Sequence, residues 1–198
     1  MAKQYDRAYF DKWYRSPGHR VGSRAELQRK VAMVVHLAEH YLARPLRNVL
    51  DVGCGEGAWR APLLHLRPRV DWRGLDASPY VVDRYGRTRN IGLAGFGQLG
   101  ELRFDRRFDL IVCSDVLHYV PAGELRRGLS GFTELLEGLA FLEVFTSHDR
   151  VSGDCEGFIA RTPDWYRARF GDAGLLACGS HAYLGPRLLR SAAALECF

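Results

Sequence analysis

The sequence predicts one α/β domain that is built on a parallel sheet with helices on both faces. From Arg47 onward, short apolar runs alternate with helix-like stretches, and this alternation is typical of βαβ units. Hydrophobic residues make up 47% and charged residues 26% of the 198 residues, which suits one globular domain with a full core. No apolar run approaches the roughly 20 residues that a membrane span needs.

Two helices are expected before the first strand. The first 20 residues are rich in aromatic and basic side chains and end near a Pro17-Gly18 turn, which predicts a short helix. Ser23 and Glu26 have the spacing of a capping box, and apolar residues follow at helical spacing as far as Leu42. The second helix is therefore predicted to begin just after Ser23 and to end near Leu42.

The remaining elements follow from apolar runs and from proline and glycine signals. Strands are expected at N-V-L-D-V (48–52), V-D-W-R-G-L-D (70–76), F-D-L-I-V-C-S (108–114) and G-L-A-F-L-E-V-F (138–145). Helices are expected over 56–66 and 78–85, from Pro121 to about Leu136, and from Pro163, with Thr162 as N-cap, to about Phe170. Residues 146–161 lack any period and are predicted to form a loop, and 173–184 and 187–198 are predicted to form two strands joined by a Gly-Pro turn.

Charge and cysteine content narrow the class of protein. The net charge is +5, but the basic residues are spread along the chain, which favours a solvated basic surface and makes nucleic-acid binding unlikely. The five cysteines are scattered without a C-x-x-C pair, which argues against a disulfide framework and a zinc site, so we expect no metal. The N-terminus lacks the apolar stretch of a secretory signal, and we expect a cytoplasmic protein without a membrane segment.

The stretch from Val49 to Trp59, V-L-D-V-G-C-G-E-G-A-W, is a strand that runs into three glycines and then a helix. Glycines let the backbone approach a ligand, and the start of a helix offers free N–H groups, so the stretch indicates a nucleotide-like ligand. Gly53, Gly55 and Ala58 satisfy G-x-G-x-x-G/A, and Asp76 follows Gly53 at about the spacing of a ribose-binding acid. A nicotinamide-dependent oxidoreductase is therefore one interpretation.

Two details of the same stretch favour a different cofactor. Asp51 lies inside the strand, and the third glycine is Gly57, so that the loop reads D-x-G-x-G-x-G. In this form the stretch resembles the first motif of the class I S-adenosylmethionine-dependent methyltransferases. Four further segments agree with that family in order and spacing: W-R-G-L-D-A-S ending the second strand, G-F-G-Q-L (95–99), F-D-L-I-V-C-S-D-V-L-H-Y-V (108–120) and F-L-E-V-F (141–145). The resemblance covers about residues 45–198.

The resemblance implies a Rossmann-like sheet of seven strands in the order 3-2-1-4-5-7-6, with the last strand antiparallel. It also implies one methyltransferase domain over residues 1–198, with 1–20 as a lid-like segment, and S-adenosyl-L-methionine as the cofactor. The cofactor-binding residues that it implies lie in four segments: Asp51, Gly53, Cys54 and Gly55; Asp76, Ala77 and Ser78; Gln98 and Leu99; Ser114 and Asp115. Among these, Asp51 is expected to orient the cofactor's ammonium group, and Asp76 to accept hydrogen bonds from the ribose hydroxyls.

Methyl transfer from a sulfonium needs chiefly alignment, with a base only where the acceptor must lose a proton. His118 is the candidate base, because it follows the fourth strand and its ordinary pKa suits proton abstraction. The alternative is a histidine that fixes the loop or packs on the adenosine.

Four residues are candidates for substrate binding: Tyr14, Tyr119, Glu143 and His148. In the N-terminal segment Tyr5, Tyr9 and Trp13 are expected either to close over the cofactor with Tyr14 or to pack on the core.

The segment after the fourth strand also narrows the acceptor. Enzymes of this family that methylate adenine or glutamine nitrogen carry [DN]-P-P-[YF] there, whereas this chain has S-D-V-L. A small-molecule acceptor is therefore favoured over RNA or protein. A degenerate cofactor-binding partner without activity is the non-enzymatic alternative, and the oligomeric state cannot be read from the sequence.

Overall fold

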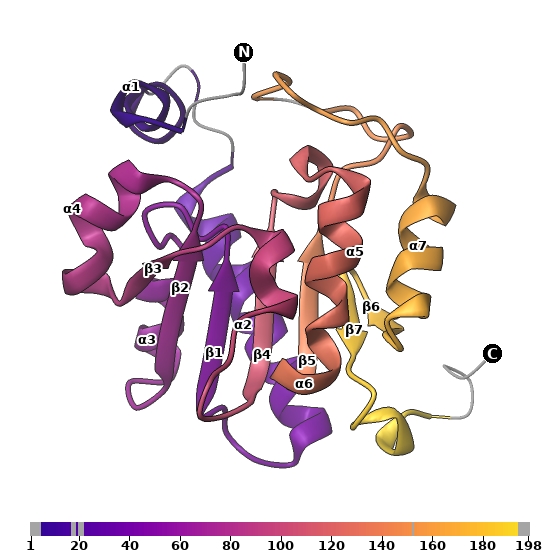
Figure 1. Ribbon diagram of the computed structural model, residues 1–198. Coiled ribbons are helices and arrows are strands. Elements are labelled where there is room, and N and C mark those ends of the chain that lie inside the picture. The colour runs from indigo at the N-terminus through magenta and orange to yellow at the C-terminus, as the bar shows by residue number, and fades with distance from the viewer. Residues whose placement is uncertain (1–4, 17–18, 20–21, 152, 194–198) are drawn as a thin grey trace.

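The computed structural model describes residues 5–16, 19, 22–151 and 153–193, and these residues form a layered α/β fold (Figure 1). The sheet has the strand order β3-β2-β1-β4-β5-β7-β6, as the resemblance implied. Strands β1 to β5 pair in parallel, and β7 runs antiparallel to both β5 and β6. The strands are β1 (Asn48–Val52), β2 (Asp71–Asp76), β3 (Ile91–Leu93), β4 (Phe108–Ser114), β5 (Leu136–Glu143), β6 (Leu176–Gly179) and β7 (Ala182–Leu184).

Helices cover both faces of the sheet, and each face has its own core. The α-helices are α1 (Arg7–Phe10), α2 (Arg24–Leu42), α3 (Arg60–Leu66), α4 (Pro79–Arg89), α5 (Ala122–Ser130), α6 (Phe132–Leu135) and α7 (Pro163–Asp172). Val49 packs in a cluster with side chains of α2, α3 and α4, whereas Leu50 packs with side chains of α5 and α7. Because neighbouring residues of β1 pack into two different cores, this strand is buried on both faces after its first residue.

The predicted helix caps are present. The Ser23 hydroxyl accepts a hydrogen bond from the Glu26 N–H (3.1 Å), and the Glu26 carboxylate accepts one from the Ser23 N–H. Thr162 caps α7 through the Trp165 N–H (3.2 Å), as predicted. Ser78, whose capping role was not predicted, caps α4 through the Val81 N–H (3.2 Å). Each of these helices therefore begins where its capping residue predicts.

Several boundaries differ from the prediction. Strand β5 ends at Glu143 instead of Phe145, and α4 continues to Arg89 instead of ending near Tyr85. The helix expected from Pro121 to about Leu136 is two helices, α5 and α6, and β5 already begins at Leu136. The chain bends at Gly131, where a Cβ would lie only 2.5 Å from the carbonyl oxygen of Leu99. Residues 56–59 form turns, so that α3 begins at Arg60, and β3 was not located from the sequence because it has only three residues.

The predicted C-terminal hairpin is wrong in its position. Both strands, β6 and β7, lie within 176–184, and they are joined at Ser180 and His181, where His181 takes a positive φ of 55°. The Gly185-Pro186 pair follows the hairpin, and the Gly185 N–H donates to the Gly138 carbonyl (2.9 Å). The next described residues form a 3-10 turn at Leu189–Ser191 instead of a strand, and 194–198 lie outside the described residues.

The fold brings the carboxyl ends of β1, β2 and β4 together at one edge of the sheet. The N-terminal segment, with α1 and the π-helical turn Asp11–Arg15, lies beyond this edge (Figure 1). Across the ranges that the structure describes, we find no helix long and apolar enough to cross a membrane.

Candidate functional site

In the glycine loop after β1 (residues 53–57), neighbouring side chains lie very close to the glycine backbone. Gly53, Gly55 and Gly57 have φ values of 69°, 53° and 81°, a region that side chains with a Cβ rarely adopt. A Cβ on Gly53 would lie 2.5 Å from a methyl group of Val116, and a Cβ on Gly57 would lie 3.3 Å from the Trp72 ring. Gly57 therefore serves packing on β2, whereas the first two glycines shape the loop at the sheet edge.

Asp76, at the end of β2, is tied directly to the glycine loop. Its carboxylate is buried and accepts hydrogen bonds from the N–H groups of Gly55 (2.7 Å) and Ser78 (2.8 Å). Burial raises the pKa of Asp76, and these two N–H groups partly offset that rise. Asp76, the acid that was expected to act together with the glycine loop, therefore contacts that loop directly.

Asp51 is the second buried acid of the site. It is 2% exposed, and within the described residues its Oδ2 atom has no hydrogen-bond partner. Burial, and then the negative charge of Asp76, raise the pKa of Asp51 to about 8. A buried carboxylate oxygen without a donor suits a ligand that brings its own donor, such as an ammonium group. The residues of this site therefore fit the amino-acid end of S-adenosylmethionine.

The turn after β4 carries Asp115 and His118. Asp115 has a positive φ of 63°, its N–H donates to the carbonyl of Glu143 (3.1 Å), and its side chain is 62% exposed. His118 is 0% exposed, and its Nε2 lies 3.4 Å from Oδ1 of Asp115. The Phe145 N–H donates to Nδ1 of His118 (3.4 Å), and the imidazole contacts the rings of Tyr119, Phe145 and Phe158.

Glu143, at the end of β5, joins the same edge to α2. Its carboxylate accepts hydrogen bonds from the Ser114 hydroxyl and from Nζ of Lys30. The Glu143 side chain is 14% exposed, and that of Lys30 is 33% exposed. The two residues therefore form a partly buried ion pair beside the end of β4.

The N-terminal segment rests on the glycine loop. A Cβ on Gly55 would lie 2.7 Å from the phenol oxygen of Tyr14. Tyr14 as a whole is 41% exposed, but its hydroxyl end is turned toward the loop, and the burial of that end, followed by the charges of Asp76 and Asp115, raises its pKa. Arg15 forms an ion pair with Glu56, which lies between Gly55 and Gly57.

Further contacts hold the same segment at the start of α4. The carbonyl of Tyr5 accepts a hydrogen bond from the Ser78 hydroxyl, and the rings of Phe10 and Tyr80 are stacked at 5.7 Å. Pro17, Gly18 and Arg20 lie outside the described residues.

The other predicted site residues lie farther from this cluster or use their polar atoms elsewhere. The Tyr119 hydroxyl donates to the carbonyl of Asp154 in the 146–161 loop, and His148 lies exposed in the turn from Thr146 to Asp149. The Gln98 amide oxygen accepts from the Gly95 N–H (2.8 Å), whereas Leu99 is 0% exposed in the core. Ala77 is exposed beside Asp76.

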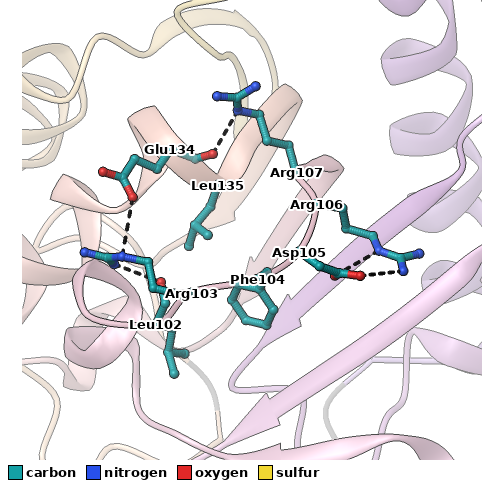
Figure 2. A pocket seen from close by; sticks show the side chains of 8 residues that line it. All are labelled: Leu102, Arg103, Phe104, Asp105, Arg106, Arg107, Glu134 and Leu135. Atoms are coloured by element: carbon teal, nitrogen blue, oxygen red, sulfur yellow. Dashed lines mark hydrogen bonds and ion pairs between the residues drawn. The ribbon is translucent and has the colours of Figure 1, made fainter.

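A surface hollow of about 520 Å³ lies near the opposite edge of the sheet (Figure 2). Its lining comes from the segments that precede β4 and β5: Leu102, Arg103, Phe104, Asp105, Arg106, Arg107, Glu134 and Leu135. Arg103 pairs with Glu134 (3.8 Å) and Arg106 with Asp105 (2.9 Å), so these charges already have partners. The hollow contains no residue of the glycine-loop cluster.

Two residues of the cluster were missed in the sequence: Glu56 and Lys30. The residues that they contact lie far away along the chain. Arg15 and Glu56 are 41 positions apart, and Lys30 and Glu143 are 113 positions apart. The one available signal was weak: Lys30 is one of three lysines in the chain.

The chain is similar to known methyltransferases. A family model described as a methyltransferase domain matches residues 23–177. The trans-aconitate 2-methyltransferase of Deinococcus radiodurans is 30% identical over 119 residues, which cover 55% of this chain and 42% of that protein. The match therefore spans less than half the length of this relative.

Solved structures share the fold at low sequence identity. The magnesium protoporphyrin IX methyltransferase from Synechocystis, crystallised with bound SAH, has a TM-score of 0.63 at 19% identity, covering 91% of this chain and 96% of that one. A sugar N-methyltransferase from Streptoalloteichus has a TM-score of 0.59 at 17% identity, covering 86% and 95%. With the family match over most of the chain, the protein belongs to the methyltransferase domain family, the class I S-adenosylmethionine-dependent methyltransferases.

Proposed function

We propose that this chain transfers the methyl group of S-adenosylmethionine to a small-molecule acceptor by in-line displacement. The observation that carries the proposal is the pair of buried acids around the glycine loop. Asp76 accepts a hydrogen bond from the loop N–H of Gly55. In the described part of the chain Oδ2 of Asp51 is buried and accepts no hydrogen bond of good geometry, although the nearby Trp72 side chain counteracts part of the rise in its pKa. Together they suit a ligand that has hydroxyl groups at one end and an ammonium group at the other.

The proposed roles follow from these positions. The backbone of Gly53, Cys54 and Gly55 would meet the methionine part of the cofactor, and Asp51 its ammonium group. Asp76 would accept the ribose hydroxyls beside Ala77 and Ser78, and Gln98 and Leu99 stay predictions for the adenine. The cofactor supplies an electrophilic methyl group on a sulfonium, and the chain's task is to align it and to exclude water.

The acceptor side rests on fewer observations. Ser114 ends β4 and Asp115 follows it, and Glu143 accepts a hydrogen bond from Ser114. This supports Ser114 and Asp115 as cofactor-binding residues near the transferred methyl, and Glu143 and Tyr119 as neighbours of the acceptor. Tyr14 is placed to meet either the cofactor or the acceptor, and His148 stays a prediction. The names of similar proteins, which refer to trans-aconitate, a sugar and magnesium protoporphyrin IX, support a small molecule over RNA or protein.

We also propose the N-terminal segment as a lid and the cytoplasm as the compartment. The lid is supported by Tyr14 over Gly55 and by the Arg15–Glu56 ion pair. The compartment is supported by Cys54, Cys113, Cys155 and Cys178, which are free thiols among the described residues.

Isothermal titration with S-adenosylhomocysteine tests the proposal. We expect saturable binding of one ligand per chain, and thermal-shift measurements should show stabilisation by this ligand but not by NAD(H). Stabilisation by NAD(H) alone would support the oxidoreductase interpretation. Cofactor binding without turnover on small-molecule, RNA and protein acceptors would favour a cofactor-binding partner without activity.

A further inference from the structure

The base for the proposed reaction can be assigned from the contacts of His118. The imidazole is 0% exposed, so an acceptor cannot reach it without a rearrangement of the turn. Its Nδ1 accepts a hydrogen bond from the backbone N–H of Phe145 (3.4 Å), which leaves the proton of the neutral ring on Nε2. Nε2 in turn lies 3.4 Å from Oδ1 of Asp115. Nδ1 is therefore engaged by the backbone, whereas Nε2 faces the Asp115 carboxylate at a distance slightly longer than an ordinary hydrogen bond.

Asp115 is the member of this pair that reaches the opening of the site. Its side chain is 62% exposed, and the following residue, Val116, packs on Gly53 of the glycine loop. Its charge also contributes, after burial, to the raised pKa values of Tyr14 and Tyr119. The positive φ of 63° aims this side chain, and aspartate and asparagine tolerate that conformation better than most residues do.

We propose that Asp115 faces the transferred methyl group and takes the acceptor's proton, and that His118 is a positioning residue that orients the Asp115 carboxylate through its Nε2–H. The proposal deepens the proposed function and rests on it. It differs from the sequence prediction, in which His118 itself was the base.

The step balances without any other reactant. A lone pair on the acceptor's nitrogen or oxygen forms the bond to the methyl carbon as the carbon–sulfur bond breaks, and that electron pair stays on sulfur, which becomes a neutral thioether. The acceptor's proton moves to the Asp115 carboxylate and from there to solvent. The acceptor class is therefore an N–H or O–H group that must lose a proton, rather than a carboxylate that is already ionised.

A pair of cofactor analogues tests the position of Asp115 without a known acceptor. Sinefungin carries a primary ammonium group on the carbon that replaces the methylsulfonium, whereas S-adenosylhomocysteine has nothing there. A carboxylate that faces the methyl position should therefore make the wild-type protein bind sinefungin more tightly. The measured quantity is the ratio of the two dissociation constants, taken by titration calorimetry.

Three variants separate the roles of the two residues. Asp115→Asn keeps a residue that tolerates the positive φ, and it should lower the preference for sinefungin about tenfold, as expected for a lost charge-assisted hydrogen bond. His118→Gln keeps a side-chain N–H donor and should keep the preference within about threefold, whereas His118→Phe should lose most of it. Nitrogen-15 spectra of the histidine ring should show the proton on Nε2, a measurement on the wild-type protein that does not depend on how the variants fold.

Other outcomes contradict the proposal. Equal loss of both ligands in Asp115→Asn would make Asp115 a general cofactor contact, and loss of the preference in a folded His118→Gln would make His118 the group that faces the methyl. A proton on Nδ1, or a wild-type protein without preference for sinefungin, would also overturn it. A wild-type protein that binds neither analogue would overturn the proposed function itself.

Discussion

The phenol of Tyr14 lies directly over Gly55. Its oxygen is 2.7 Å from the point that a Cβ on Gly55 would occupy, and Gly55 itself has a φ of 53°. The loop that is proposed to bind the cofactor is thus also the surface on which the N-terminal segment rests. A change at Gly55 should therefore affect both ligand binding and the packing of that segment.

Gly55→Ala tests this double constraint. The positive φ costs about 1–2 kcal/mol for a residue with a Cβ, and the contact with Tyr14 adds to it. We expect binding of S-adenosylhomocysteine to weaken by at least about tenfold, measured by titration calorimetry. The control is Gly171→Ala in α7, where a Cβ meets no atom of the described residues within 4 Å; this variant should bind normally and be slightly more stable. Normal binding by Gly55→Ala would show that the loop is not the binding surface.

From the raised pKa of Asp51 we expect cofactor binding to release a proton. Its pKa is raised to about 8 in the free protein, so at pH 7 the carboxyl is mostly protonated. An ammonium group bound beside it would favour the ionised form and lower this pKa, so affinity should rise as the pH increases toward 8. Titrations at pH 7 in phosphate and Tris, which differ in ionisation enthalpy, should show release of nearly one proton per chain.

The matched variant for this measurement is Asp51→Asn. It keeps the size of the side chain but has no carboxyl to titrate, and it should release no proton. Release of a full proton by Asp51→Asn would assign the effect to another group.

Asp76→Ala should weaken binding of S-adenosylhomocysteine by about 1–3 kcal/mol, because charge-assisted hydrogen bonds to the ribose are lost. The variant also loses the acceptor of the Gly55 and Ser78 N–H groups, so the loop should become less ordered. Asp71→Ala, at the exposed start of the same strand, is the control and should bind as the wild type does. Unchanged affinity of Asp76→Ala would refute the ribose assignment.

The Arg15–Glu56 ion pair offers a test of the proposed lid. Arg15 also donates to Asp11 (2.6 Å) and to the Tyr85 hydroxyl (3.3 Å), so it joins the segment to both the loop and α4. Arg15→Ala should speed the dissociation of S-adenosylhomocysteine about threefold, as expected for one partly exposed pair, and added salt should reduce the difference. Stopped-flow displacement measures this rate. Arg7→Ala removes an exposed pair within the same segment and should leave the rate unchanged.

The parts of the fold that the sequence predicted well are governed by local or strongly patterned signals. Strand β4 was predicted to the residue, because a run of seven residues is buried on both faces except at its last position. The Ser23 and Thr162 caps set their helix starts for the same local reason. The glycine loop and its acid at the end of β2 also lie within one βαβ unit, where spacing alone brings them together.

The errors come from contacts that are distant in the chain. Gly131 divides the predicted helix because the backbone of Leu99 approaches it, and nothing near Gly131 signals this contact. The hairpin was misplaced because Gly185-Pro186 is the stronger turn signal, whereas the turn forms at His181, a residue that rarely takes a positive φ. The burial of His118 likewise depends on rings far along the chain, those of Phe145 and Phe158, so the sequence near His118 does not show it.

The lowered pKa of Asp109, near the start of β4, implies that the stability of the fold depends on pH. Its carboxylate is 2% exposed and accepts two hydrogen bonds from Arg44 (2.7 and 2.8 Å) and one from the Arg47 N–H (2.7 Å). Burial alone would raise the pKa of Asp109, but the bonds from Arg44 and Arg47 outweigh it and lower that pKa. The pair therefore stabilises the fold above the unfolded pKa of about 3.9 and loses this contribution as the pH falls through the lower folded value.

Asp109→Asn should lower the free energy of unfolding at pH 7 by about 3 kcal/mol, because the Arg44 charge loses its buried partner. The loss should shrink as the pH falls below 4, since the wild-type carboxyl then becomes protonated as well. Urea unfolding at several pH values measures both effects. Asp105→Asn breaks the pair with Arg106 on the surface, where the carboxylate is 77% exposed, and it should unfold at the same urea concentration as the wild type. An equal loss in the two variants would mean that burial of Asp109 adds nothing to its ion pair.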